Sequence, residues 1–376
     1  MKLMRWVGVV VAALATTTLL SLGSLTQAAQ PTVTLTTEPP LAEVIPFQDP
    51  VRLILQAING GGQPLADARL SLQLLTPPKT PWLTSDFPWV EGTTLLELGA
   101  IAPQGQVELE QVMPIRGTYT LNVQVEPLIT NAFAPFSQSL SVRVPENPVK
   151  YRNVAILLAV LLVLGFAGGW VIGGRTSLEA GEIAPQRVRM LLSGAIVVAI
   201  AALLIVNFSA RSASAHSEGH HTPLAIPTSR QGQQVTAQIS GQTQATVGQL
   251  ATQTVTLNPN IDPRPELLLN IRTLDLESHE PVFTYTGIAP ADGQFTWRQQ
   301  FFDGAPHQVV VEVLPPDQSN ADFESFQIAQ AIDVTGLEPP LSVRLITLSY
   351  FTLCFVLGLL AGLGTHRWRL QGVPHA

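Results

Sequence analysis

The sequence predicts a mainly β protein with α-helical membrane spans: two immunoglobulin-like antiparallel β-sandwiches and three spans after a signal peptide. Two long polar segments alternate apolar and polar residues with a period of two, which is typical of half-buried strands. Three uncharged apolar runs, 154–174, 190–210 and 345–365, have 21 residues each. At 1.5 Å per helical residue, each run crosses about 30 Å of hydrocarbon.

The amino-terminal segment, residues 1–29, has the features of a secretory signal peptide. Lys2 and Arg5 precede a long apolar stretch, and small residues, Ala28 and Ala29, end it. That order is typical of a cleaved signal, although an uncleaved signal anchor has a similar pattern. Both interpretations deliver the chain from residue 30 onward to the outer side of the membrane.

The first polar segment, residues 30–150, predicts an antiparallel sandwich of about seven strands. Its alternation places Val51, Leu53, Leu55 and Ala57 on one face of a strand. Turn-forming glycines follow at 60–62, as expected between antiparallel strands. The single cysteine, Cys354, lies in the third apolar run, so no intramolecular disulfide forms and the sandwich depends on its apolar core.

One loop of this domain, residues 76–93, is rich in proline and aromatic residues. Its candidate partner-binding residues are Trp82, Phe87 and Trp89. The loop is either an aromatic flap over the end of the sandwich or an exposed platform for a partner or the lipid surface. Tryptophan is common in such half-wetted places.

The rest of the chain repeats the arrangement of a sandwich followed by a span. The expected segments are a span at 154–174, a cytoplasmic loop at 175–189, a span at 190–210, a polar His-containing linker at 211–229, a second sandwich at 230–340, a span at 345–365 and a cytoplasmic tail at 366–376.

A sequence repeat links the two sandwiches. Ile101-Ala102-Pro103, followed by Gly105, recurs as Ile288-Ala289-Pro290, followed by Gly293. From that glycine onward, a constant offset of 188 residues aligns alternating apolar positions of the two domains. Equivalent domains are expected on the same side of a membrane, so 190–210 is the returning span. This predicts a multi-pass protein of the bacterial inner membrane with both β-domains in the periplasm.

Small residues recur at helical spacing in the expected spans, and they predict close helix packing. The residues are Gly165, Gly169 and Gly173 in the first span, and Gly358 and Gly362 in the third. Glycine every fourth residue lets two helices approach closely in lipid. The spans contain no Asp, Glu, Lys, Arg or His, which argues against an ion-coupled transporter.

Catalytic and cofactor motifs are absent from the sequence, so neither an enzyme nor a bound cofactor is expected. A candidate metal site comprises His216, His220 and His221, whose imidazoles could bind Cu or Zn with Glu218 nearby. The surrounding Ser, Gly and Ala residues favour a solvated tether over a preorganised site. The net charge of −7 and the lack of a long basic run argue against nucleic-acid binding.

The chain resembles bacterial envelope proteins with YtkA-like or related immunoglobulin-like domains, on the basis of the signal, the span and the run Gly62-Gln63-Pro64-Leu65-Ala66-Asp67-Ala68. Arg116 to Pro148 and Phe301 to His307 are similar to uncharacterised multi-pass membrane proteins of cyanobacteria. The resemblance implies the fold and an envelope location, without an assigned activity.

These observations predict a non-enzymatic membrane protein whose outer sandwiches bind a protein partner or stabilise an assembly. Its expected contacts are the lipid bilayer and either a partner or a second copy, reached through the spans. The alternative is a periplasmic, copper-type metal-handling accessory protein, to which the resemblance lends some weight.

Overall fold

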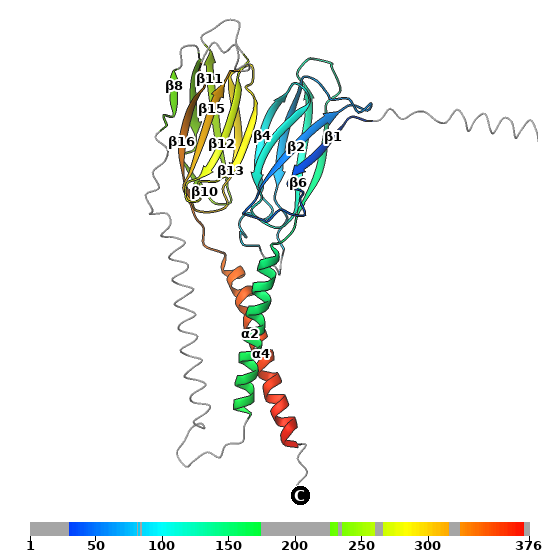
Figure 1. Ribbon diagram of the computed structural model, residues 1–376, viewed down its shortest axis with the longest axis vertical. Helices are drawn as coiled ribbons and strands as arrows, with labels where there is room; N and C mark the ends of the chain where they lie inside the picture. Colours follow the sequence, from blue (N-terminus) through cyan, green and yellow to red (C-terminus); the bar gives the residue numbers. More distant parts are fainter. Residues whose placement is uncertain are drawn as a thin grey trace, which may run out of the picture.

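The computed structural model describes residues 30–80, 82, 85–173, 226–231, 235–259, 266–315 and 324–371. Within these ranges the chain forms two β-sandwiches side by side above two long helices (Figure 1). The mainly β fold with apolar helices is confirmed. The expected signal peptide, cytoplasmic loop and second span, at 1–29, 175–189 and 190–210, lie outside the described residues. Nearly all of the linker at 211–229 also lies outside them.

The first sandwich consists of two layers, β1-β2-β5 and β4-β3-β6-β7. The alternation predicted from the sequence is seen directly, because Val51, Leu53, Leu55 and Ala57 are all buried. Its strands are β1 Thr32–Glu38, β2 Pro50–Ile58, β3 Ala68–Leu75, β4 Thr94–Ala102, β5 Gln106–Val112, β6 Gly117–Pro127 and β7 Phe136–Val144.

The second sandwich repeats this order and adds two short strands, β8 and β10. Its layers are β8-β9-β11-β14 and β13-β12-β15-β16-β10, with β10 parallel to β16. The strands are β8 Ser229–Gln231, β9 Val235–Gly241, β10 Gln244–Thr246, β11 Leu250–Pro259, β12 Leu268–Asp275, β13 Pro281–Ile288, β14 Gln294–Gln300, β15 His307–Leu314 and β16 Phe326–Thr335.

The two sandwiches are joined edge to edge through both layers. Strand β5 pairs with β13, and β4 pairs with β14, both antiparallel. One isolated pair, Ile101 with Ile288, links β4 to β13. Each layer therefore continues from one sandwich into the other, and the buried side chains of both domains form one core cluster. None of these four strands is left with an open edge at this boundary, where unpaired backbone groups would otherwise be exposed.

The pairing has the symmetry of the sequence repeat. Leu109 and Leu98 lie 188 and 187 residues before Trp297 and Tyr285. The register pairs Leu109 with Tyr285 and Leu98 with Trp297, so each pair maps onto the other when the repeats are exchanged. Ile101 pairs with its own equivalent, Ile288. A pseudo-two-fold axis therefore passes through the boundary between the domains.

Two helices leave the same end of this β body (Figure 1). They are α2 Pro148–Ile172 and α4 Leu341–Gln371. Helix α2 begins six residues before the expected span because Asn147 caps it, its Oδ1 accepting a hydrogen bond from the Val149 N–H at 2.9 Å. Proline at the first helical position suits this start. The charges of Lys150 and Arg152 end the apolar run without ending the helix.

Of the described residues, two segments are helical, long and apolar enough to cross a membrane, Pro148–Ile172 and Leu341–His366. The helices run parallel. Gly165 of α2 approaches Phe355 of α4, and Gly169, one turn further along α2, approaches Leu359, one turn further along α4. Both therefore point away from the sandwiches.

Turn glycines provide a test of the connection between β13 and β14, two strands that form the domain boundary. Gly293 has φ +74°, and a Cβ there would lie 2.3 Å from the Leu257 carbonyl oxygen, whereas Gly62, with φ +77°, has open space around it. We expect Gly293→Ala to lower the free energy of unfolding by about 3 kcal/mol and Gly62→Ala by about 1 kcal/mol. Thermal unfolding of the purified chain measures both. Equal losses would show that backbone conformation alone matters at Gly293.

Candidate functional site at the junction of sandwiches and helices

The loop at residues 76–93 lies where both sandwiches meet the helices. It folds back on itself, because the Thr76 hydroxyl donates to the Val90 carbonyl at 2.6 Å and accepts from the Thr93 N–H at 2.9 Å. The Gly92 N–H donates to the Pro77 carbonyl at 2.8 Å. The loop is thus a closed unit with three separate neighbours, which are the second sandwich, α2 and α4. We call the region around it the junction.

Its first neighbour is the second sandwich. The Phe87 ring lies 5.2 Å from the ring of Phe47 and 5.9 Å from that of Phe302. Trp89 donates its indole N–H to the Phe302 carbonyl at 3.5 Å. The aromatic side chains of the loop therefore pack across the boundary between the two domains.

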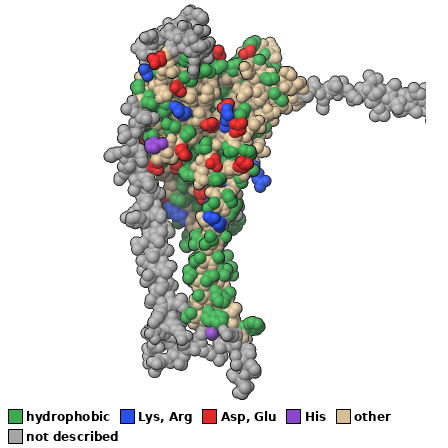
Figure 2. All heavy atoms as spheres, in the orientation of Figure 1, with side chains coloured by type: hydrophobic (Ala, Val, Ile, Leu, Met, Phe, Trp, Pro, Cys, Tyr) green, Lys and Arg blue, Asp and Glu red, His purple; other side chains and the backbone are tan. Residues whose placement is uncertain are grey.

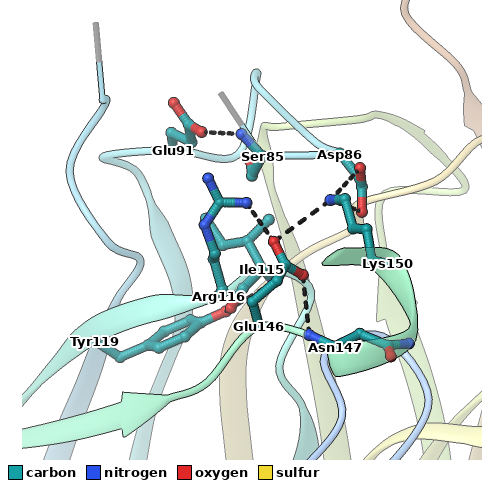
Figure 3. A network of polar contacts seen from close by, with 9 residues as sticks. All are labelled: Ser85, Asp86, Glu91, Ile115, Arg116, Tyr119, Glu146, Asn147 and Lys150. Carbon is teal, nitrogen blue, oxygen red and sulfur yellow. Dashed lines mark hydrogen bonds and ion pairs between the residues drawn. The ribbon is translucent and has the colours of Figure 1, made fainter. Parts of the chain in front are cut away.

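Its second neighbour is the start of α2, where Glu146 lies between two cations (Figure 3). Arg116 forms an ion pair with the Glu146 carboxylate, and Lys150 lies 3.5 Å from it. The Lys150 amine also contacts both carboxylate oxygens of Asp86 at 2.7 Å. The Glu146 side chain is 6% exposed, so its charge is compensated mainly by these two residues. The network ties the first turn of α2 to the loop and to the base of the first sandwich.

A tyrosine fixes the backbone beside this network. The Tyr119 hydroxyl donates to the Ile115 carbonyl at 2.6 Å and accepts from the Ile115 N–H at 2.9 Å. This is the tyrosine corner found in immunoglobulin-like domains. Burial raises the pKa of Tyr119 well above its usual range, so the hydroxyl keeps the proton that it donates. The adjacent Arg116 is thereby held toward Glu146.

The equivalent position in the second sandwich is a histidine. His307 lies 188 residues after Tyr119, is 1% exposed, and places its Nδ1 2.7 Å from the Ala305 carbonyl oxygen. Its Nε2 lies 3.8 Å from Asp303 Oδ1. Burial raises the pKa of Asp303, and the charge of His307 opposes that rise. In both domains the side chain at this corner therefore contacts a backbone carbonyl, through a phenol in the first domain and an imidazole in the second.

The third neighbour is α4. The Tyr350 hydroxyl donates to the Trp82 carbonyl at 2.6 Å, while the Trp82 side chain is 70% exposed. The three candidate residues of the loop therefore differ in exposure. Trp82 is open to its surroundings, whereas Phe87 and Trp89 are partly buried against the core. The Phe87 ring packs against Phe302 of the other domain, a contact that the loop sequence alone does not reveal.

The structure brings the glycines of the two helices together. A Cβ at Gly165 would lie 2.2 Å from the Phe355 carbonyl oxygen, and a Cβ at Gly169 would lie 2.0 Å from that of Leu359. From α4, Gly358 and Gly362 approach the α2 backbone as closely, and Gly173 lies against His366. The two glycine faces are therefore occupied by each other within one chain. Self-association through the spans would need a different helix face.

The candidate metal ligands His216, His220 and His221 lie outside the described residues, and that site stays a prediction. In the part of the chain that the structure describes, no three or more His, Cys, Asp or Glu residues are grouped to hold a metal ion.

Comparison with known proteins gives distant structural matches. No protein-family model and no curated protein matches the chain, so the YtkA-like resemblance stays a prediction. The CARDB domain of a Pyrococcus furiosus protein, in complex with di-metal ions, is 12% identical over 31% of this chain and 96% of that one, with a TM-score of 0.20. Native Escherichia coli alpha-2-macroglobulin is 9% identical over 83% of this chain, which spans 17% of its length, with a TM-score of 0.22.

A Corynebacterium diphtheriae protein described as membrane anchored is 10% identical over 82% of this chain and 55% of that one, with a TM-score of 0.22. With each TM-score below 0.5, function has to be inferred from this chain's own geometry. That geometry defines a protein with paired immunoglobulin-like β-domains and two apolar helices long enough to cross a membrane.

The Glu146 network gives the second prediction. Glu146→Gln leaves Arg116 and Lys150 without their shared, largely buried counter-charge, so we expect the free energy of unfolding to fall by about 1–2 kcal/mol. Glu338→Gln is the matched control, because Glu338 pairs with Arg344 but its side chain is 80% exposed. We expect that change to stay within about 0.5 kcal/mol. Thermal unfolding of both variants measures the difference, and equal effects would contradict the importance of burial.

Proposed function

We propose that the protein is a non-enzymatic membrane protein that holds two joined β-sandwiches at the membrane surface for binding a protein partner or stabilising an assembly. One observation carries the proposal: two parallel apolar helices leave the same end of a β body that is continuous through both layers. Figure 2 supports it, because apolar side chains cover the helix pair whereas charged side chains lie on the sandwiches. Such an apolar surface is stable in lipid and costly in water.

The parallel direction of the helices supports a third span. Helix α2 ends at Ile172, away from the sandwiches, and the described chain resumes at Ile226 in the second sandwich. The intervening chain has to return over the length of α2, about 37 Å at 1.5 Å per residue. We therefore propose 190–210 as the returning span. With a signal peptide at 1–29, both sandwiches would lie in the periplasm and the protein in the bacterial inner membrane.

A cleft at the end of the β body far from the helices supports partner binding. Its volume is about 390 Å³, it lies on the pseudo-two-fold axis, and the repeated Ile-Ala-Pro segments of both domains line it. Leu128, which also lines it, is 41% exposed, and its neighbour Ile129 is 60% exposed. Grouped apolar side chains on a polar domain commonly mark a surface for another protein. A protein segment with apolar side chains is the occupant that this lining favours.

The helix pair gives the third prediction. Gly169→Ala puts a methyl group where the α4 backbone lies, so we expect the melting temperature of the detergent-purified chain to fall. Gly364 is also in α4 but has nothing within 4 Å of its Cβ position. There, Gly364→Ala should leave stability unchanged or raise it by up to about 1 kcal/mol, because alanine favours a helix more than glycine does. A rise for both variants would show that the helices do not pack in this way.

The fourth prediction concerns topology and assembly. Alkaline phosphatase fused at Gly181 or at His375 should be inactive, because both sites are expected in the cytoplasm, whereas fusion at Ser137 in the first sandwich should be active. Activity at Gly181 or His375 would contradict the three-span arrangement.

Crosslinking in cells followed by purification in mild detergent should recover a larger complex. Recovery as a lone monomer would contradict the proposed assembly.

A further inference from the structure

A second cleft lies at the base of the first sandwich, next to the start of α2. Its volume is about 790 Å³. Arg116, Arg143 and Tyr151 line it, together with Glu91 and Glu146. We propose that this cleft binds the phosphate of an anionic phospholipid headgroup in the leaflet beneath the sandwiches. This inference rests on the proposed membrane anchoring, because it places a lipid surface at the level of the cleft.

The depth of the cleft fits a headgroup. Tyr151 is 62% exposed and precedes the apolar run that begins at Val154 by three residues. At 1.5 Å per residue, Tyr151 lies about 4–5 Å outside the hydrocarbon, within the zone of lipid headgroups. Tyrosine is enriched at that level of a membrane protein. Figure 2 shows basic side chains just above the apolar helix pair.

Both carboxylates of the cleft already have partners within the protein, whereas one of its two arginines has no carboxylate partner among the described residues. Glu91 is 5% exposed and accepts a hydrogen bond from the Ser85 N–H at 2.7 Å. Glu146 is held by Arg116 and Lys150. By contrast, Arg143 is exposed at the end of β7, and its guanidinium forms no ion pair with any residue that the structure describes.

A guanidinium presents several N–H donors in a plane and binds phosphate oxygens in pairs. Arg143 would therefore contact the phosphate, while Arg116 stays paired with Glu146. Arg143 belongs to a chain whose overall net charge is −7, so general attraction to an anionic membrane cannot account for selective binding. The selectivity would have to arise in the cleft.

The experiment uses the full chain in nanodiscs of phosphatidylcholine and phosphatidylglycerol at a ratio of three to one. After extraction into mild detergent, native mass spectrometry measures the lipids retained. We expect phosphatidylglycerol to be enriched over its bulk share, and Arg143→Gln to reduce the enrichment about fivefold. The matched control is Arg69→Gln. Arg69 is also an exposed arginine in a strand of the first sandwich, but it lies in β3 opposite Ile101, at the end far from the helices. It should retain the enrichment.

Each other outcome contradicts a specific step. Equal enrichment in the wild type and Arg143→Gln, or no enrichment in an inserted wild type, would overturn the lipid site while leaving membrane anchoring intact. Binding of inorganic phosphate in the cleft without any enrichment of phosphatidylglycerol would show that the cleft binds the free ion instead. Failure of the chain to enter nanodiscs would contradict the membrane anchoring itself, and the lipid site with it. Unchanged melting temperatures of both arginine variants serve as the folding control.

Discussion

The pairing of β4 with β14 and of β5 with β13 is the constraint on which the rest of the structure depends. It removes four open strand edges and merges two small cores into one. The merged core buries Trp297, and Arg298 pairs with Glu97 across the boundary at 2.7 Å. Because backbone hydrogen bonds fix both layers at once, neither sandwich can rotate about the other without breaking them. The helices consequently start from a common base.

The contacts at the junction fix the direction in which the helices leave the rigid β body, and these contacts differ in strength. The contact between Lys150 and Asp86 is geometrically close, but the Asp86 side chain is 66% exposed, so water and salt weaken it. The largely buried Glu146 and the ring cluster of Phe47, Phe87 and Phe302 contribute more. The glycine contacts between α2 and α4 then carry the alignment along the helices.

Local patterns in the sequence predicted the strands well, because a half-buried strand shows its buried face every second residue. Val51 to Ala57 is such a case. The glycines also pointed to close helix contact, but their spacing says nothing about which helix lies opposite. The start of α2 was missed although Asn147-Pro148 is a capping signal, because the charges after it ended the apolar run. The edge pairing and the covering of Phe87 join residues far apart in sequence, which no local pattern reveals.

The repeat is symmetric at the boundary between the two domains and asymmetric at the end that faces the helices. The register at the boundary is preserved when the domains are exchanged. The connection after β3 is the long loop 76–93, however, whereas the connection after β12 is the short turn 276–280. The corner residue also differs, Tyr119 in one domain and His307 in the other. Duplication of a sandwich accounts for the body. The loop that contacts α2 and α4, and the cleft beside the start of α2, belong to the first domain alone, so the two copies differ at the end that faces the helices.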